Sequence, residues 1–287
     1  MLVNGCDCSI VIKTAHKEFD VPYSDETLHE AVSFLQEEAS IEGDGVCGGL
    51  RKTCGVIGCI VTPLTIGTAH LLLCLAMGAC GNPALVSETR NLYQYRLDLL
   101  PTEDTEHFDL IQDRGGERKF YEGCNVQGFE LRILRDEAIK LKLEICGVCA
   151  PRIYPYVDTF EREQGERFKG DCVSYRINGK DFSNIYGITL VSKKIGGTHT
   201  ELWIKRVLQQ GGDIPAIIDE LIITAKLLRN EYEYRYFGTF RITVKRLVQT
   251  NDETEINAAD NVVGPLRYYV AGGVSAEVFT DGGGYIQ

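Results

Sequence analysis

The 287-residue sequence has few of the residues that usually signal special chemistry, with only 5 His, 2 Met, 1 Trp and 8 Pro. The histidines stand singly, at His16, His29, His70, His107 and His199. No two of them have the spacing of metal ligands, and no H-E-x-x-H motif occurs. They are therefore predicted to be solvated or internally hydrogen-bonded, and the sequence predicts no catalytic residue, cofactor or metal site from them.

Long apolar runs are also missing. The longest, near Leu71 to Ala76, falls far short of the roughly 20 residues that a membrane-spanning helix needs. Met1 to Ile12 shows no basic stretch followed by an apolar one, as a secretion signal would. The sequence therefore predicts a soluble, cytosolic chain with no membrane partner.

An excess of positive charge is the third absence. The chain has 30 Lys and Arg against 41 Asp and Glu, a formal net charge of −11. Tight binding of nucleic acid through its phosphates needs clustered basic residues, so such a function is disfavoured. An acidic surface still tolerates DNA as a passing neighbour, because it repels the polymer and leaves it mobile.

Cysteine, in contrast, is abundant, with 11 residues. The Cys146/Cys149 pair stands alone, without the second pair that a structural zinc site usually shows at close spacing. An odd count also argues against a secreted disulfide framework. Reduced, mostly buried thiols are the favoured interpretation, and a metal site or redox chemistry is the alternative.

Short segments with period-two alternation dominate the chain. The clearest runs from Ala138 to Ile145, where Ile139, Leu141 and Leu143 share one face and lysines share the other. An Asn178-Gly179 turn and a last antiparallel pair turning at 271–273 are also expected. Strands are predicted over 9–13, 93–99, 108–111, 126–133, 138–145, 172–177, 187–193, 221–227, 232–237, 240–248 and 266–279.

Three helices are expected beside these strands. Ser24 is a possible N-cap for a helix to about Ser40, with apolar residues at helical spacing. Gly67 to Met77 is interpreted as a short buried helix. Leu202 to Gln209 is expected to be a third helix, anchored in the core by Trp203. The predicted fold class is mainly β with flanking helices (α+β), as a sandwich or barrel.

The middle of the chain looks like a linker. Ala150 to Gly170 carries two prolines, several charges and little periodicity. We therefore expect a first β domain with an N-terminal helix over 1–155, a linker over 156–170 and a second β domain over 171–287. A short echo, Asn125-Val126-Gln127-Gly128 and Asn261-Val262-Val263-Gly264, suggests two tandem copies of one unit. The alternative is one larger domain.

The stretch from Pro63 to Gly147 carries a family resemblance. An apolar helix over 64–78 precedes an aromatic strand, Tyr93 to Leu99, and then the strand Phe108 to Ile111. The run Tyr121-Glu122-Gly123-Cys124-Asn125-Val126-Gln127-Gly128-Phe129-Glu130-Leu131 follows, and it is the most specific part. In this order of elements and in these phrases, the chain resembles the tail tube, or major tail, proteins of long-tailed bacteriophages.

The resemblance implies a structural virion protein and not an enzyme. Its subunits, each with a helix on the outside, would close into rings of three or six chains, and the rings would stack into a tail tube through which DNA passes without tight binding. Other tail proteins would be further partners, and assembly would occur in the host cytoplasm. The candidate contacts between rings are the loops 43–49 and 101–106, represented by Gly43, Asp44, Gly45, Glu103 and Asp104.

Two alternatives remain open. The phrase from Ile177 to Gly187 resembles the start of distal tail or baseplate ring proteins, which share the fold. A cytosolic thiol- or metal-dependent enzyme built on the cysteines is the alternative from another class. Particle position would separate the first alternative from a tube protein, and metal content would reveal the second.

Overall fold

The structure is a computed structural model of the whole chain. It describes residues 8–14, 18–35, 50–78, 83–87, 92–101, 105–114, 117–148, 152–153, 166–194, 197–207, 213–228, 237–251, 256–257 and 262–281.

The described residues form one antiparallel sheet with one α-helix and one 3-10 turn. A mainly β fold, the coarse part of the predicted class, is thereby confirmed. The elements are β1 (Cys8–Lys13), β2 (Glu18–Asp20), β3 (Asp25–Glu26), β4 (His29–Leu35), β5 (Leu50–Pro63), α1 (Ala69–Met77), β6 (Ala84–Ser87), β7 (Leu92–Asp98), β8 (Phe108–Arg114), β9 (Glu117–Leu134), β10 (Lys140–Gly147), β11 (Arg152–Ile153), η3 (Gly170–Cys172), β12 (Val173–Ile177), β13 (Lys180–Phe182), β14 (Ile185–Lys193), β15 (His199–Val207), β16 (Ile217–Leu228), β17 (Phe237–Gln249), β18 (Ile256–Asn257), β19 (Val262–Val270) and β20 (Val274–Asp281).

The long strand β9 organises the first half of the sheet. Along one edge it pairs first with β8 and then with β14, and along the other edge it pairs with β11 and β10. From β10 the sheet continues through β5 to β4, and from β8 it continues through β1 to β2. β9 thus connects two parts of the sheet, because its first half lies next to β8 and its second half lies next to β14.

Strands β19 and β20 lie one after the other and together connect two parts of the sheet, as β9 does. Both pair antiparallel with β17, through Val270 opposite Leu247 and Val274 opposite Val244. They therefore run in the same direction, one after the other, and do not pair with each other. The prediction of an antiparallel pair turning at 271–273 is wrong, because these residues form an irregularity opposite Lys245 and Arg246 in which the Ala271 N–H donates to the Arg246 carbonyl at 2.8 Å. On the opposite edge, β19 pairs with β15 and β20 pairs with β7.

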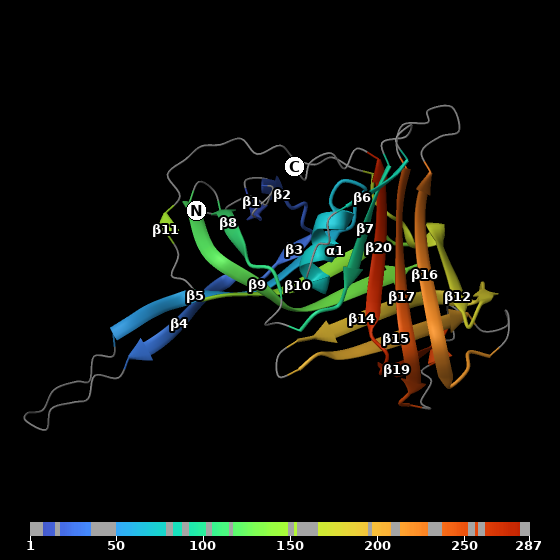
Figure 1. Cartoon of the computed structure of the whole chain (residues 1–287). Helices are drawn as coiled ribbons and strands as arrows, with labels where there is room; N and C mark the ends of the chain where they lie inside the picture. The colour runs from blue at the N-terminus through green and yellow to red at the C-terminus, as the bar shows by residue number, and fades with distance from the viewer. Residues whose placement is uncertain are drawn as a thin grey trace, which may run out of the picture.

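The two parts of the sheet run at an angle to each other, and α1 lies between them (Figure 1). All nine residues of α1 are buried, and the helix contacts β7, β9 and β20. Its sequence is apolar apart from His70, which is typical of a helix enclosed by other elements. It ends at Gly78, whose left-handed backbone (φ 109°) a residue without a side chain adopts readily. The predicted short buried helix over 67–77 is confirmed. The outside helix that the family resemblance implies is not α1, which lies inside the fold.

The other two predicted helices are wrong over the described residues. Residues 25–26 and 29–35 are the strands β3 and β4, which pair with β5. Residues 199–207 are the strand β15, in which Leu202 and Ile204 are buried. Pairing with neighbouring strands satisfies the backbone of both segments and overrides their weak local helical preference. Trp203 consequently faces outward, half-buried beneath the Arg267 guanidinium, and does not anchor the core.

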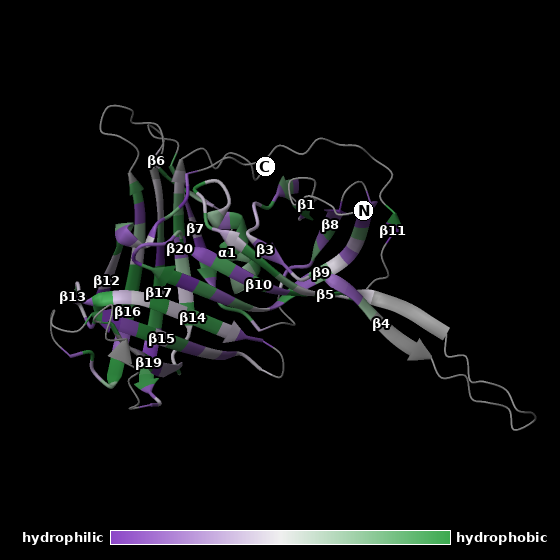
Figure 2. Ribbon diagram, turned by 180° about the vertical axis from the view of Figure 1, so that it is seen from behind, coloured by the Kyte–Doolittle hydropathy of each residue, from purple (hydrophilic) through white to green (hydrophobic). Residues whose placement is uncertain are grey.

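Most predicted strands are confirmed. In β10 the buried and half-buried positions alternate as expected from the sequence. The same alternation is visible as bands of hydrophobic and hydrophilic residues along β10, β15 and β17 (Figure 2). The predicted strand 232–237 lies outside the described residues except for Phe237, which begins β17.

The two predicted halves share the sheet and the core. β9 pairs with β14, and β7 pairs with β20. Part of the predicted linker is also built into the fold, because Phe168 is buried and donates its N–H to the Leu64 carbonyl at 2.9 Å. The division into domains at 156–170 stays a prediction. A boundary there would put the paired strands β9 and β14, and likewise β7 and β20, in different domains.

Candidate assembly surfaces

The five residues that represent the predicted contacts between rings lie outside the described part of the chain. Gly43, Asp44 and Gly45 fall in the segment 36–49, which connects β4 to β5. Glu103 and Asp104 fall in 102–104, between β7 and β8. Their role therefore stays a prediction, and the surfaces below come from the described strands.

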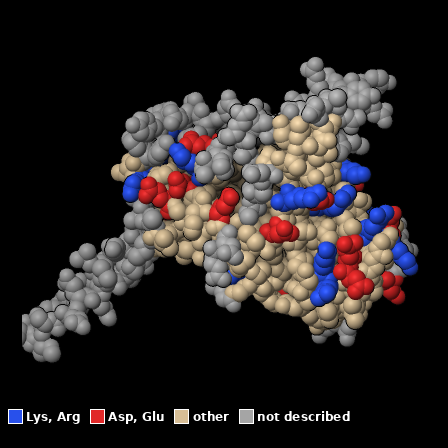
Figure 3. Space-filling view, in the orientation of Figure 1, with Lys and Arg blue, Asp and Glu red and all other residues tan. Residues whose placement is uncertain are grey.

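The first surface is the free edge of β6. Among the described strands β6 pairs only with β7, in the register Ala84 opposite Gln94 and Leu85 opposite Tyr93. Leu85 and Val86 are 48% and 51% exposed, so this edge is apolar, and its outer side has no partner among the described strands. Figure 3 shows an uncharged area over the part of the molecule where β6 and β7 lie in Figure 1. An exposed apolar edge strand is a template for pairing with another chain.

The second surface is the free edge of β13. This strand pairs only with β12 among the described strands, through a turn in which Asn178 and Gly179 both have positive φ, at 47° and 79°. The predicted Asn-Gly turn is thereby confirmed, and such a turn suits a two-residue hairpin. The Asn178 side-chain oxygen accepts the backbone N–H groups of Asp219 and Glu220, which fixes the hairpin on β16.

These two edges are the ends of one run of paired strands. The order is β6, β7, β20, β17, β16, β12 and β13. On the outer face of this run, Glu277 accepts hydrogen bonds from Gln94 and Arg241, which tie β7, β20 and β17 together. The run thus presents an apolar edge at one end and a partly charged edge, with Lys180 and Asp181, at the other.

A third surface is a two-stranded arm. β10 pairs with β5 only from Val56 onward, so residues 50–55 have β4 as their only partner among the described strands. Figure 1 shows β4 and the beginning of β5 extending away from the rest of the sheet. A two-stranded ribbon is marginally stable alone in water. The arm is therefore suited to packing against something outside its own chain.

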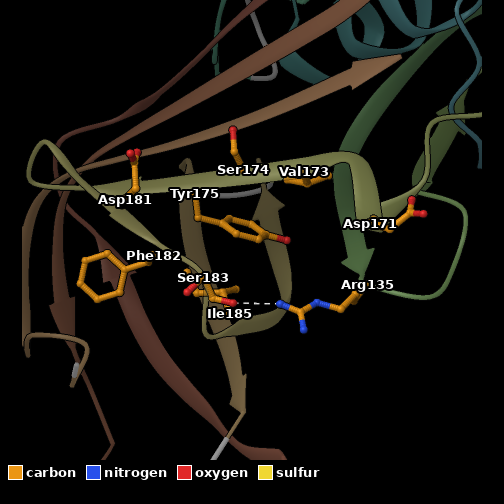
Figure 4. A pocket seen from close by; sticks show the side chains of 10 residues that line it. Arg135, Asp171, Val173, Ser174, Tyr175, Asp181, Phe182, Ser183 and Ile185 are labelled. Carbon is orange, nitrogen blue, oxygen red and sulfur yellow. Dashed lines mark hydrogen bonds between the residues drawn. The ribbon is translucent and has the colours of Figure 1, made fainter. Parts of the chain in front are cut away.

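A cleft of about 390 Å³ lies beside β13. Its walls are the chain around Arg135, which follows β9, together with η3, β12 and β13. The Arg135 guanidinium donates to the Ser183 carbonyl at 2.9 Å, and the ring of Tyr175 runs toward this arginine (Figure 4). Burial raises the pKa of the Tyr175 hydroxyl far above its ordinary value, so it stays a neutral donor.

Backbone contacts fix the walls of this cleft. The Arg135 N–H donates to the Tyr186 carbonyl at 3.0 Å, and the Gly170 N–H donates to the Glu137 carbonyl at 3.0 Å. Gly170 lies so close to β9 that a Cβ there would stand 1.9 Å from the Leu134 carbonyl oxygen. Only glycine permits this approach, which brings η3 and β12 next to Arg135.

The cysteines offer no described metal site. Within the described ranges, no group of three or more His, Cys, Asp and Glu side chains is placed to hold a metal ion. Cys59, Cys124, Cys146 and Cys172 are free thiols. Cys74 is disulfide-bonded, so the prediction of reduced thiols is wrong for this residue. Burial and a hydrogen bond with Asp171 raise the pKa of the Cys172 thiol, which disfavours the reactive thiolate.

Sequence reasoning missed both β6 and the cleft. Ala84-Leu85-Val86 is a short apolar run after Asn82-Pro83, a signal that could have indicated an edge strand. The cleft had no such signal, because Arg135 and the segment 170–185 meet through the pairing of β9 with β14 and through the hydrogen bond of Gly170 with Glu137.

Comparisons with known proteins add no relative. No protein-family model matches the chain, and no curated protein matches its sequence. In the described part of the chain, no helix is long and apolar enough to cross a membrane.

Proposed function

We propose that the chain is a structural subunit that polymerises into rings, and that the rings stack into a tube like the tail tube of long-tailed bacteriophages. The observation that carries the proposal is the run of paired strands that ends on β6 at one side and on β13 at the other. The sequence resemblance over 63–147 supplies the kind of assembly.

Two different free edges favour head-to-tail association. When β6 of one subunit pairs with β13 of the next, a β13 edge stays free at one end of the row of subunits and a β6 edge at the other. Subunits therefore keep adding until these two edges meet and close a ring. Strand addition of this kind satisfies the unpaired backbone groups of both edges. The arm formed by β4 and residues 50–55 would then pack on a neighbouring subunit, in its own ring or in the next.

The acidic composition fits a conduit for DNA. A net charge of −11 supplies carboxylates that would keep DNA mobile inside the tube. We expect the lumen to carry an excess of Asp and Glu, and an assembled structure with a basic lumen would contradict this part of the proposal.

The number of chains per ring distinguishes two versions of the proposal. If residues 1–155 and 171–287 act as two tube-type copies, three chains make a ring that resembles a ring of six. If the whole chain is one unit, six chains make the ring. The pairings of β9 with β14 and of β7 with β20 favour the single unit.

Electron microscopy of the concentrated, purified protein tests the proposal. We expect rings or tubes, and mass measurement of an isolated ring gives the number of chains. A monomer by light scattering at every concentration would contradict the proposal. Stoichiometric zinc or iron in the same preparation would instead favour the metal-dependent enzyme.

A further inference from the structure

The cleft beside β13 contains two donors that no described acceptor fully satisfies. Most described arginines form ion pairs, as Arg114 does with Glu26 and Arg118 with Asp113. Arg135 has no carboxylate partner in the described part of the chain, and its one hydrogen bond from the side chain goes to the Ser183 carbonyl. Since a guanidinium carries five N–H donors in a planar fork, most of its binding capacity is unused.

Tyr175 supplies the second donor. The residue is only 6% exposed, but its hydroxyl is not among the buried polar atoms that lack a partner, and the residue lines the cleft. The hydroxyl is therefore available at the wall of an open cleft to donate a hydrogen bond to a ligand. Figure 4 shows the hydroxyl end of Tyr175 directed toward the side of the cleft where Arg135 lies.

The acidic residues of the cleft are placed away from these donors. Asp181 is exposed and pairs with Arg176 at 3.3 Å, which offsets its charge. Asp171 interacts with the Cys172 thiol, and in Figure 4 its carboxylate points away from Tyr175. The guanidinium and the neutral hydroxyl are therefore the groups that a ligand between them would meet.

We propose that this cleft binds a carboxylate group, presented by an acidic side chain of an extended polypeptide segment that lies along β13. A guanidinium binds a carboxylate through two parallel N–H donors, and the Tyr175 hydroxyl adds a third. The free edge of β13 gives the backbone of the segment its hydrogen bonds, and Phe182 and Ile185 give it apolar walls. The proposed ring gives the same β13 edge to β6 of a neighbouring subunit, so the peptide and the neighbour would compete for it. The site is therefore tested on the unassembled chain, where the edge is free among the described strands and the result does not depend on ring formation.

Binding is measured on the dilute, unassembled protein by following the side-chain N–H signal of Arg135 by NMR at low salt. The probes are a blocked peptide, Thr-Val-Glu-Val-Thr, its Gln counterpart, and benzoate. The Glu peptide is expected to shift the signal saturably and to bind at least about tenfold more tightly than the Gln peptide, since a hydrogen-bonded charge is lost. Benzoate is expected to bind more weakly than the Glu peptide, because it makes no contact with the strand edge.

Single substitutions test which residues bind the peptide. Tyr175→Phe keeps the ring and is expected to weaken binding of the Glu peptide about tenfold, as measured by peptide fluorescence anisotropy. Arg135→Gln should abolish binding, and Arg135→Lys should weaken it because a lysine cannot form the planar fork. Arg241→Gln, an exposed arginine on β17, should leave binding unchanged.

Three results would overturn the inference. The first is equal binding of the Glu and Gln peptides, and the second is unchanged affinity in a folded Arg135→Gln protein. The third is benzoate binding as tightly as the Glu peptide, which would assign the cleft to a small acid in place of a polypeptide segment.

Discussion

Phe168 and Phe240 pack edge to face, with their ring centroids 5.0 Å apart. Phe168 lies near the end of the segment predicted to be a linker, and Phe240 lies near the start of β17. Gly238 makes room for this contact, because a Cβ there would stand 3.2 Å from the Phe168 ring and 2.9 Å from Ile66. The contact therefore attaches the segment 166–170 to the core of the sheet.

Phe168→Ala should lower the free energy of unfolding by about 3–4 kcal/mol, through lost burial and the cavity left behind. Urea unfolding followed by circular dichroism measures this change. Leu85→Ala, at an exposed position on β6, serves as the control and should change stability by less than about 0.5 kcal/mol in dilute protein. A loss below about 1 kcal/mol for Phe168→Ala would mean that the segment is not part of the core.

Gly170→Ala should be strongly destabilising for a different reason. The new Cβ would collide with the Leu134 carbonyl, so β9 and η3 must separate. We expect a loss of at least about 2 kcal/mol and a changed environment for the Arg135 side chain. Ser174→Ala, at an exposed neighbouring position, is the control. Full stability of the alanine variant would show that the close approach is absent in solution.

Lys194 is a buried cation. It is 2% exposed, and its Nζ has no hydrogen-bond partner in the described structure. A Cβ placed on Gly78 would stand 3.3 Å from this Nζ, so the amine lies against the C-terminal end of α1. Burial lowers the pKa of Lys194 from 10.5 to about 8. The unfolded chain therefore binds this proton more tightly than the folded chain does.

The stability of the protein should consequently rise with pH between about 8 and 10.5. Below this window both states are protonated and the cost of the buried charge is fully present, and above it both are neutral. Buried tyrosines act in the opposite direction, but only above pH 10, where the unfolded chain begins to ionise them. Burial raises the pKa of Tyr268, for example, to about 12.

Lys194→Met should remove this rise and stabilise the protein at pH 7 by about 3 kcal/mol, since one pKa unit corresponds to about 1.4 kcal/mol. Thermal or urea unfolding at pH 7, 8, 9 and 10 measures both effects. Lys193→Met, at the exposed neighbouring position, is the matched control and should keep the wild-type profile. An unchanged profile in Lys194→Met would assign the pH dependence to other groups.

The sequence allowed prediction of those elements whose local pattern and final environment agree. Residues 138–145 alternate strictly, and they form a strand with one buried face. Residues 69–77 are apolar apart from His70, and they form an enclosed helix. Leu28, Ala31 and Leu35 stand at helical spacing, but pairing with β5 decided their conformation. The pairs run from His29 with Ile57 to Leu35 with Leu50, so the partner strand lies 15 to 28 residues along the chain and leaves no local signal.

The cleft was beyond sequence reasoning for a related reason. Arg135 and Tyr175 belong to no motif, and they come together because Gly170 and Gly187 both pack closely against Leu134. The sequence at 271–273 also does not show whether β19 and β20 form a hairpin or lie one after the other. Glycine is suited to an irregularity in a strand as well as to a turn. The predicted loops at Gly43 and Asp104 stay predictions for assembly experiments.

The proposed function predicts that one charge on the β6 edge prevents assembly. Val86→Lys introduces a charge into an edge that is apolar and exposed, and natural sheets use lysine in this way to block edge pairing. We expect the variant to stay monomeric by light scattering and electron microscopy at concentrations where the wild-type protein forms rings.

Val248→Lys is the matched control for this prediction. Val248 is similarly exposed, at 45%, but it lies on β17 between β16 and β19, where both edges of the strand are already paired. It should therefore assemble like the wild type. Both variants should keep the wild-type free energy of unfolding within about 0.5 kcal/mol, because neither removes a buried contact. Rings formed by Val86→Lys as readily as by Val248→Lys would exclude β6 as an assembly edge. Loss of assembly in both variants would instead point to a contact on the outer face of the sheet.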